Sequence, residues 1–487
     1  MRFILKKIVK KYRDVSVEIK AATWYAVGNI IQKIAPWMVM IILTHYLSTE
    51  EFGIYSVFMS WLEIFEIVIT LRIYSNGYVA GLVRDDENRT TYTATMQSLS
   101  IILIMIWMLV YLMYHKIVNS VTGISTSLSI MMICSFIGTI SFGLWSSRQR
   151  VDNQYKKMLF AIIVYGLIGP IIGALTVFLD LDNPIFYVVA TRTIIQLGVA
   201  IPFFISNYKG SFTLWKKDFA IDALRYNLPL MPYYLSMILL NHSDRLMIQK
   251  IDGYEDAALY SVSYSAAMVI FVISGALNLS LQAWLFKELK IKDSSKDKSR
   301  LITVGTVIVS FCAVAEIVMA PELILVLGGG EKYLQAIWVM PPLAISVIVM
   351  YIYQQYVNVL FYYKKTKYIL FASVFAAISN IILNAIFIPL FGYVAGGYTS
   401  LASYITVMIL YSILARKECA ANEIQMNNYF NTKLQMIILV VTSIIALSMV
   451  AVYRNIGVRY LLAVVMLVFL IVTRKKWMPE LRKGKKL

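Results

Sequence analysis

Charged side chains inside long apolar stretches are the first candidates for chemistry in this sequence. Lys33 falls near the middle of the first stretch. Glu63 and Glu66 fall near the middle of the second, one helical turn apart on the same face. A charge at the centre of a bilayer is costly, so each of these residues requires a partner or a water-filled cavity. Two hypotheses stay open: a buried ion pair between Lys33 and one glutamate, and a cavity site in which the spare carboxyl titrates or Lys33 meets an anion.

The apolar stretch at 226–249 carries five consecutive polar residues that end with Asp244 and Arg245. These two are adjacent, so they point in different directions and each requires a contact other than its neighbour. A solvated position at the mouth of a cavity is the alternative. Pro229 and Pro232, earlier in the stretch, free backbone carbonyls and permit a bend, which suits a gating helix.

Arg192 and Glu316 are single charges in two further stretches, where each either lines a cavity or forms an interhelical pair. Arg72 lies near the end of its stretch, and its side chain is expected to snorkel to the membrane surface. Amide side chains within the later stretches favour interhelical hydrogen bonds over ligand contacts. They are Asn278, Gln282, Gln354, Gln355, Asn358, Asn380 and Asn384.

The elements that position these residues must be membrane-spanning helices. Of the 487 residues, 59 % are hydrophobic and 15 % are charged, and a soluble domain could not hide that much apolar surface. In lipid the backbone must satisfy its own hydrogen bonds, and β-barrel strands would be shorter and would alternate. The sequence therefore predicts an all-α integral membrane protein. Apolar runs long enough to span fall at fourteen places: 23–47, 53–71, 93–114, 122–145, 158–179, 184–206, 226–249, 257–285, 301–327, 333–361, 368–390, 392–415, 434–453 and 458–473.

Basic residues alternate between the two sides of these helices. With the N-terminus in the cytosol, 36 of the 45 Lys and Arg residues fall in cytosolic segments and five in outer loops. The net charge of +18 thus marks membrane topology and not nucleic-acid binding. Both termini are predicted to be cytosolic, with an amphipathic segment at 1–22 and a basic tail at 474–487.

Motifs for cofactor or metal chemistry are absent from the sequence. It holds no nucleotide-binding glycine loop, no metal-ligand cluster and no nucleophile elbow, and its three cysteines are scattered. No cofactor is therefore expected, and the loops leave no room for a soluble catalytic domain.

A short internal repeat links two of the predicted helices. The second opens with the residues EFGIYSV at 51–57 and the eighth with DAALYSV at 256–262. Six helices separate the copies, which indicates a parallel repeat of two six-helix lobes. We expect an N-lobe at 23–206, a C-lobe at 226–415 and an appended helix pair at 434–473.

The pattern resembles the polysaccharide-exporting flippases, known as Wzx or O-antigen and capsule repeat-unit transporters, in the larger group that includes the MATE exporters. The resemblance covers essentially the whole chain. It rests on GNI at 28–30 through LSTEEFGIYSV at 47–57, on HSDRLMI at 242–248 followed by ALYSV at 258–262, and on the plan of twelve helices plus two.

The resemblance implies a MATE-like fold in the bacterial cytoplasmic membrane and a flippase for undecaprenyl-diphosphate-linked oligosaccharides that works by alternating access. It makes Lys33, Arg192 and Arg245 candidates for binding the diphosphate or acidic sugars in a cationic cavity. Proton or sodium coupling would fall to the acidic candidates, and polysaccharide polymerase machinery would be a partner. Those acidic residues are Glu63, Glu66, Asp244 and Glu316.

Two other functions are compatible with such a chain. A MATE-like exporter of cationic drugs or of another lipid would want acidic residues in its cavity, and the intramembrane acids and cations are nearly balanced here. A membrane polysaccharide polymerase or ligase is the third reading, although such enzymes usually need a sizeable outer loop and none is present.

Overall fold

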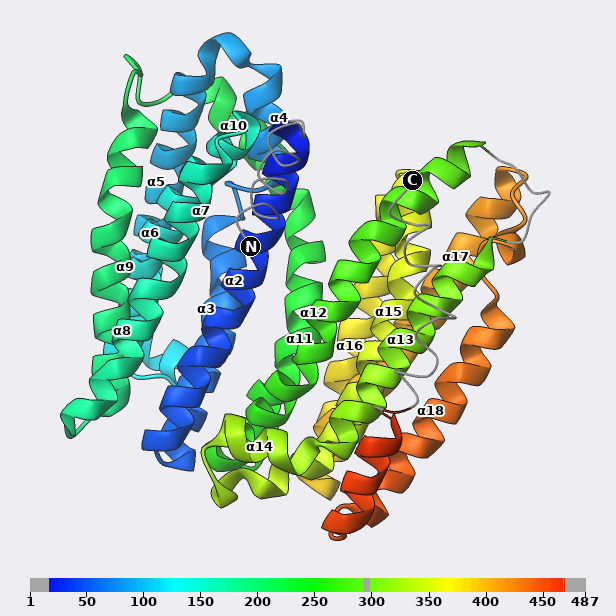
Figure 1. Ribbon diagram of the computed structural model, residues 1–487. Coiled ribbons are helices and arrows are strands. Elements are labelled where there is room, and N and C mark those ends of the chain that lie inside the picture. Colours follow the sequence, from blue (N-terminus) through cyan, green and yellow to red (C-terminus); the bar gives the residue numbers. More distant parts are fainter. Residues whose placement is uncertain (1–16, 292–297, 467, 469–487) are drawn as a thin grey trace, which may run out of the picture. The chain divides into compact units, whose positions relative to one another are not determined.

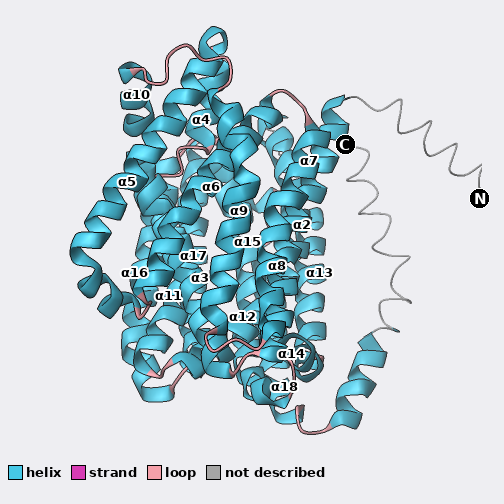
Figure 2. Cartoon of the chain, turned by 90° about the vertical axis from the view of Figure 1, so that its left-hand side faces the viewer, coloured by secondary structure: helices cyan, strands magenta, loops and turns pink. Residues whose placement is uncertain are grey.

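The computed structural model describes residues 17–291, 298–466 and 468, and this part of the chain is helical without any strand (Figure 2). Eleven of its helices are long and apolar enough to cross a membrane. Three further predicted spans coincide with α2 (Val17–Tyr46), α11 (Met231–Ile251) and a shorter apolar helix at Ile456–Met466. The all-α membrane fold is confirmed, and fourteen crossings stay a prediction. The predicted basic tail and most of the segment at 1–22 lie outside the described residues.

The chain divides into two compact units. Unit 1 contains Met1–Leu47 and Trp61–Met231, and unit 2 contains Ser48–Ser60 and Pro232–Leu487. The boundary therefore crosses the interior of one helix, α3 (Thr49–Thr70). A capping box starts this helix, because Ser48 N–H donates to Glu51 Oε2 at 2.8 Å while Glu51 N–H donates to Ser48 Oγ at 3.2 Å.

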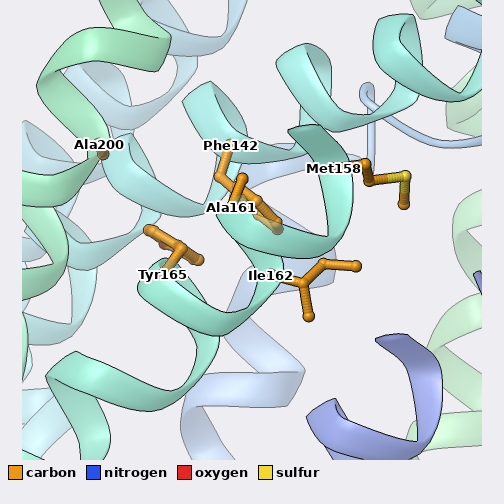
Figure 3. Close-up of a cluster of buried hydrophobic side chains, with 6 residues drawn as sticks. All are labelled: Phe142, Met158, Ala161, Ile162, Tyr165 and Ala200. Atoms are coloured by element: carbon orange, nitrogen blue, oxygen red, sulfur yellow. The ribbon is translucent and has the colours of Figure 1, made fainter. Parts of the chain in front are cut away.

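Unit 1 is built around α5, α6 and α9, which pack against one another (Figure 1). A π-helical turn at Val164–Ile168 joins α7 to α8 and carries Tyr165, whose ring stacks on Phe142 at 4.5 Å in the cluster of Figure 3. Besides α2, the helices are α4 (Asn76–Arg84), α5 (Arg89–Thr122), α6 (Thr126–Val151), α7 (Tyr155–Ile163), α8 (Gly169–Leu175), α9 (Pro184–Tyr208) and α10 (Lys217–Asn227).

Helix α10 begins in the connector at 207–225, which separates the predicted N-lobe from the predicted C-lobe. Arg84 Nη2 donates to Asp222 Oδ2 at 2.5 Å, and the ring of Tyr92 meets that of Phe219 edge-on at 5.2 Å. The connector is therefore a folded part of unit 1.

Unit 2 surrounds α15, which is almost wholly buried and packs against α12, α13, α16, α17 and α18 (Figure 1). Its helices besides α11 are α12 (Tyr254–Ile291), α13 (Ser299–Val318), α14 (Ala320–Gly328), a 3₁₀ helix at Glu331–Val339, α15 (Met340–Tyr362), α16 (Thr366–Phe391), α17 (Val394–Ala421) and α18 (Thr432–Val452).

Two breaks in unit 2 test the predicted spans. The prediction of a single helix at 301–327 is wrong, because the helix is interrupted at Met319, between α13 and α14. Pro321 explains the break, since proline has no N–H to continue the helical hydrogen-bond ladder. The expected separation at Gly392 is confirmed, and its φ of +67° suits glycine.

Close helix contact in unit 1 depends on glycine. A Cβ at Gly173 would lie 2.7 Å from the backbone oxygen of Val188. We expect Gly173→Ala to lower the free energy of unfolding by about 1–3 kcal/mol, because α8 must move off α9. Thermal unfolding of the purified protein in detergent measures this. Gly198→Ala is the matched control, because a Cβ there meets nothing within 4 Å. Equal melting of the two variants would contradict the close packing of α8 on α9.

Candidate functional site: a buried carboxylate held by four helices

Asp244 of α11 carries a fully buried carboxylate that accepts hydrogen bonds from several helices of unit 2. Its side chain is 0 % exposed. Oδ1 accepts hydrogen bonds from the amide groups of Asn380, at 3.0 Å, and Asn384, at 2.6 Å. Oδ2 accepts from the hydroxyl of Tyr260, at 2.6 Å, and from that of Ser400. The donors come from α12, α16 and α17, so one side chain of α11 links four helices.

A second set of hydrogen bonds fixes the orientation of the two amides. Ser243 Oγ donates to Asn380 Oδ1 at 2.5 Å, and the Thr399 hydroxyl donates to Asn384 Oδ1. Because both amide oxygens are occupied, the NH₂ groups face the carboxylate. We call Asp244 and its four donors, together with Ser243 and Thr399, the Asp244 cage.

The chemistry of the cage is set by the fact that, among the described residues, Asp244 has no cationic partner. All four donors to Asp244 are neutral, so the site retains a negative charge when the carboxyl is ionised. Hydrogen bonds to an ionised group are strong, which makes the burial tolerable. Both amide oxygens are already used by Ser243 and Thr399, so the oxygen atoms directed at the centre of the cage are those of Asp244, Tyr260 and Ser400. The chemistry that the cage can supply is therefore the uptake of a proton by the carboxyl group of Asp244. No group of three or more His, Cys, Asp or Glu residues that could hold a metal is found in the described part of the chain.

Arg245 turns away from the cage, as the adjacent positions predict. Its Nη1 donates to Ser60 Oγ at 2.9 Å, and its guanidinium lies 5.7 Å from the ring centroid of Tyr264. The side chain is 8 % exposed. The alternative of a solvated mouth is therefore wrong for both Asp244 and Arg245.

Glu66 in unit 1 has a different kind of partner, because a cationic side chain lies beside its carboxylate. Its Oε1 accepts from the Tyr74 hydroxyl and lies 3.8 Å from Arg72 Nε. Leu71 and Arg72 have φ of +50° and +47°, in the left-handed region that costs energy for residues with a side chain. This turn directs Arg72 back to Glu66. The expectation that Arg72 snorkels is replaced by an ion pair.

Arg192 lies half-buried on α9, where its backbone N and Cβ pack against Gly173 of α8. Tyr165 in the π-helical turn is within electrostatic range of both Arg192 and Glu66. Lys33 is exposed on α2 and Glu63 is half-buried on α3. A direct pair between Lys33 and either glutamate stays a prediction.

Glu316 on α13 is 7 % exposed, and neither of its carboxyl oxygens has a hydrogen-bond partner among the described residues. Within that part of the chain it therefore forms no interhelical pair. A group in this position is held neutral more readily than charged.

Six of the seven amide side chains form the interhelical bonds that the sequence predicts, and Oε1 of the seventh, Gln354, has no hydrogen-bond partner among the described residues. Asn278 Oδ1 on α12 accepts from Gln355 at 3.1 Å and from Asn358 at 2.9 Å, both on α15. Nothing in the residue pattern connects Tyr260, Thr399 or Ser400 with Asp244. The one usable signal was the spacing of Asn380 and Asn384, which places two amides on one face of α16.

The family of the chain follows from residues 19–286, which match the family model described as "Polysaccharide biosynthesis protein". The chain belongs to this family. An uncharacterized membrane protein of Haemophilus influenzae is 22 % identical over 435 residues, which cover 82 % of this chain and 98 % of that protein.

Two solved structures share the fold of this family member. The lipid II flippase MurJ in an inward closed conformation superposes with a TM-score of 0.69 at 12 % identity, covering 93 % of this chain and 99 % of MurJ. An inward-facing multidrug resistance MATE transporter gives a TM-score of 0.63 at 13 % identity, covering 82 % of this chain and 98 % of that one. The expected resemblance and the MATE-like fold are confirmed.

Replacing the Asp244 carboxylate tests the cage. Asp244→Asn places an NH₂ group against hydrogen-bond donors, so we expect a loss of about 1–3 kcal/mol for each donor left unpaired. Thermal unfolding in detergent measures the effect, and exposed Asp182→Asn is the matched control. An unchanged melting temperature for Asp244→Asn would show that the cage does not stabilise unit 2.

Glu316, which is buried, and Glu66, which is partly buried, should respond oppositely to the same substitution. Glu316→Gln breaks no hydrogen bond among the described residues, so we expect unchanged or higher stability. Glu66→Gln weakens the contact with Arg72 and Tyr74 and should lower stability. Melting temperatures of both variants, measured side by side, check this. Destabilisation by Glu316→Gln alone would contradict the assignment.

Proposed function

We propose that the protein is a flippase that moves undecaprenyl-diphosphate-linked oligosaccharide repeat units across the cytoplasmic membrane, for the assembly of O-antigen, capsule or exopolysaccharide. Membership of the polysaccharide biosynthesis family carries the proposal. The fold supports it, because a lipid II flippase has the same architecture. Both ends of the chain would lie in the cytosol, and translocation would proceed by alternating access between an N-lobe and a C-lobe.

In this proposal the basic residues bind the substrate and the acidic residues bind the coupling ion. The diphosphate carries negative charge, so Arg245, Arg192 and Lys33 would bind it or acidic sugars by charge-assisted hydrogen bonds. Asp244 would take up a proton, or a sodium ion once its donors have moved aside, because its carboxylate is buried among neutral groups. Glu63, Glu66 and Glu316 are further candidates for coupling. Of these, Glu316 resembles a proton carrier most, because neither of its carboxyl oxygens has a hydrogen-bond partner among the described residues.

A MATE-like exporter of drugs or of another lipid is the second candidate, since a multidrug transporter shares the fold. The acidic Asp244 cage would suit its coupling ion equally well. A polymerase or ligase is the third reading, and no observation at the site favours it.

A clean deletion in the native host separates these functions. We expect loss of surface polysaccharide together with accumulation of single repeat units on the lipid carrier. Mass spectrometry of extracted lipids and staining of surface polymer provide the two readouts. Normal polymer without accumulated intermediate, combined with altered drug resistance, would favour the drug exporter.

Complementation of the deletion tests the cationic residues. We expect Arg245→Ala and Arg192→Ala each to lower surface polysaccharide by roughly tenfold or more, the equivalent of one lost charge-assisted contact. The exposed-loop variant Lys209→Ala is the control, and immunoblots of membranes establish equal amounts of protein. Wild-type polysaccharide in both arginine variants would exclude the proposed cationic site.

A further inference from the structure

A short loop between α9 and α10, at 211–217, exposes three large apolar side chains. The exposed fractions of Phe212, Leu214 and Trp215 are 106 %, 57 % and 42 %. The other residues of the loop are polar or basic. Single exposed apolar residues are common on proteins, but three within four positions form a patch of the kind that marks a contact with a protein or a membrane.

The backbone of the 211–217 loop is held on α5 by hydrogen bonds. Ser98 Oγ donates to Leu214 O at 3.0 Å, and Lys216 N–H donates to Thr95 Oγ1 at 3.1 Å. These bonds fix the backbone on both sides of Trp215. The exposure of the apolar side chains is therefore a property of a fixed conformation of the loop.

The hydroxyl groups that hold the loop belong to one stripe of α5. Thr91, Thr95 and Ser98 follow one another at spacings of four and three, which places them on one face of the helix. Ser211 Oγ contacts the first of them by donating to Thr91 Oγ1 at 3.4 Å. The loop thus covers the beginning of this stripe.

The same stripe of α5 continues as exposed apolar side chains. Its next positions are Ile102, Met105 and Leu109, whose exposed fractions are 38 %, 52 % and 62 %. Helix α5 is long and apolar enough to cross a membrane, so apolar side chains exposed along its middle contact acyl chains. The 211–217 loop therefore lies at the start of a lipid-facing stripe, and lipid is the partner closest to its apolar side chains.

The depth of the loop follows from the register of α5. The predicted span of this helix begins at residue 93, and Ser98 lies about 7 Å farther along the helix axis. Because Leu214 O accepts from Ser98, the loop reaches that depth. Apolar segments that lie in a membrane interface are buried about 5–10 Å, at the boundary between headgroups and acyl chains.

The charge of the loop matches an anionic bilayer surface. Lys216 and Lys217 are exposed and directly follow Trp215 in the chain. Tryptophan is enriched at membrane–water interfaces, and basic residues close to the surface are attracted to anionic headgroups. The order of apolar and basic side chains is therefore the one that an interfacial segment requires.

We propose that the 211–217 loop is an anchor that inserts Phe212, Leu214 and Trp215 into the headgroup–acyl boundary of an anionic leaflet. Lys216 and Lys217 then contact lipid phosphates from the water side. Because α5 holds the loop and α10 begins at Lys217, the anchor sets the depth at which the connector leaves the membrane. The inference does not depend on the substrate that the protein moves.

A nitroxide label on the loop measures its depth. Leu214→Cys is labelled in a full-length chain whose three native cysteines have been replaced, and the protein is reconstituted in liposomes of phosphatidylethanolamine and phosphatidylglycerol. Power saturation compares the collisions of the label with oxygen, which partitions into lipid, and with a water-soluble nickel chelate. We expect collisions with oxygen to predominate.

Two further positions calibrate the depth. Asp218→Cys is exposed in the first turn of α10 and reports on water, and Ile106→Cys is exposed on α5 and reports on acyl chains. The oxygen-to-nickel ratio at 214 should be at least threefold above that at 218 and below that at 106. A ratio equal to that at 218 would overturn the proposal. Since the liposomes contain no other protein, that outcome would point to a protein partner for the loop.

Liposomes of neutral lipid test the role of charge. In phosphatidylcholine alone, the oxygen-to-nickel ratio at 214 should fall at least twofold, because Lys216 and Lys217 lose the anionic headgroups that hold the loop at the surface. An unchanged ratio would refute the preference for an anionic leaflet.

Removal of the α5 hydroxyls tests how the anchor is positioned. Thr95→Val combined with Ser98→Ala deletes two of the groups that hold the loop, so we expect the label at 214 to become more mobile and its oxygen-to-nickel ratio to fall at least twofold. Ser120→Ala is the matched control, because it removes a hydroxyl of the same helix that bonds to Ile117 O within α5. Identical spectra in the double variant and the control would contradict the positioning role of α5.

Discussion

Burial of the Asp244 carboxylate is the constraint on which unit 2 depends. An ionised group in an apolar interior must have its lone pairs satisfied, and here four neutral donors from three other helices do so. The packing of α11, α12, α16 and α17 therefore cannot change independently of this group. Gly396 of α17 shows how closely α17 packs on Tyr260 of α12, because a Cβ at this position would lie 3.1 Å from the Tyr260 ring. A change in the charge of Asp244 would therefore alter the hydrogen bonds that join all four helices.

The two units bury acids by different physical means. Unit 1 turns its own backbone back through two left-handed residues so that Arg72 meets Glu66, and the cost in backbone energy is offset by an ion pair. In the described part of unit 2, the side chains that hydrogen-bond to Asp244 are all neutral, and Glu316 has no hydrogen-bond partner. An acid that is already paired has little need of an ion from solution. Under the proposed function, coupling therefore belongs to unit 2 more than to Glu66.

Particular residues show how far sequence reasoning reaches. Adjacent positions required Asp244 and Arg245 to point apart, and they do. Hydropathy placed a helix at 301–327 but did not recognise that Pro321 ends it, because apolar composition continues across the break. Arg72 was expected to snorkel because its distance along the helix indicated the membrane surface. The left-handed turn that returns it to Glu66 has no signal in residue type, since neither Leu71 nor Arg72 favours positive φ.

The sequence by itself determined that the chain spans a membrane as helices and that charged residues such as Asp244, Arg245 and Glu316 lie within them, because lipid forces the backbone into helices and hydropathy is read residue by residue. It also contained the repeat around Ser56 and Ser261. Only the tertiary structure decided which groups meet: Asn380, Asn384, Tyr260 and Ser400 at Asp244, Ser60 at Arg245, and the two repeat copies with each other. These partners are 16 to 205 residues apart in the chain, and their contact depends on how helices pack, which local periodicity does not specify.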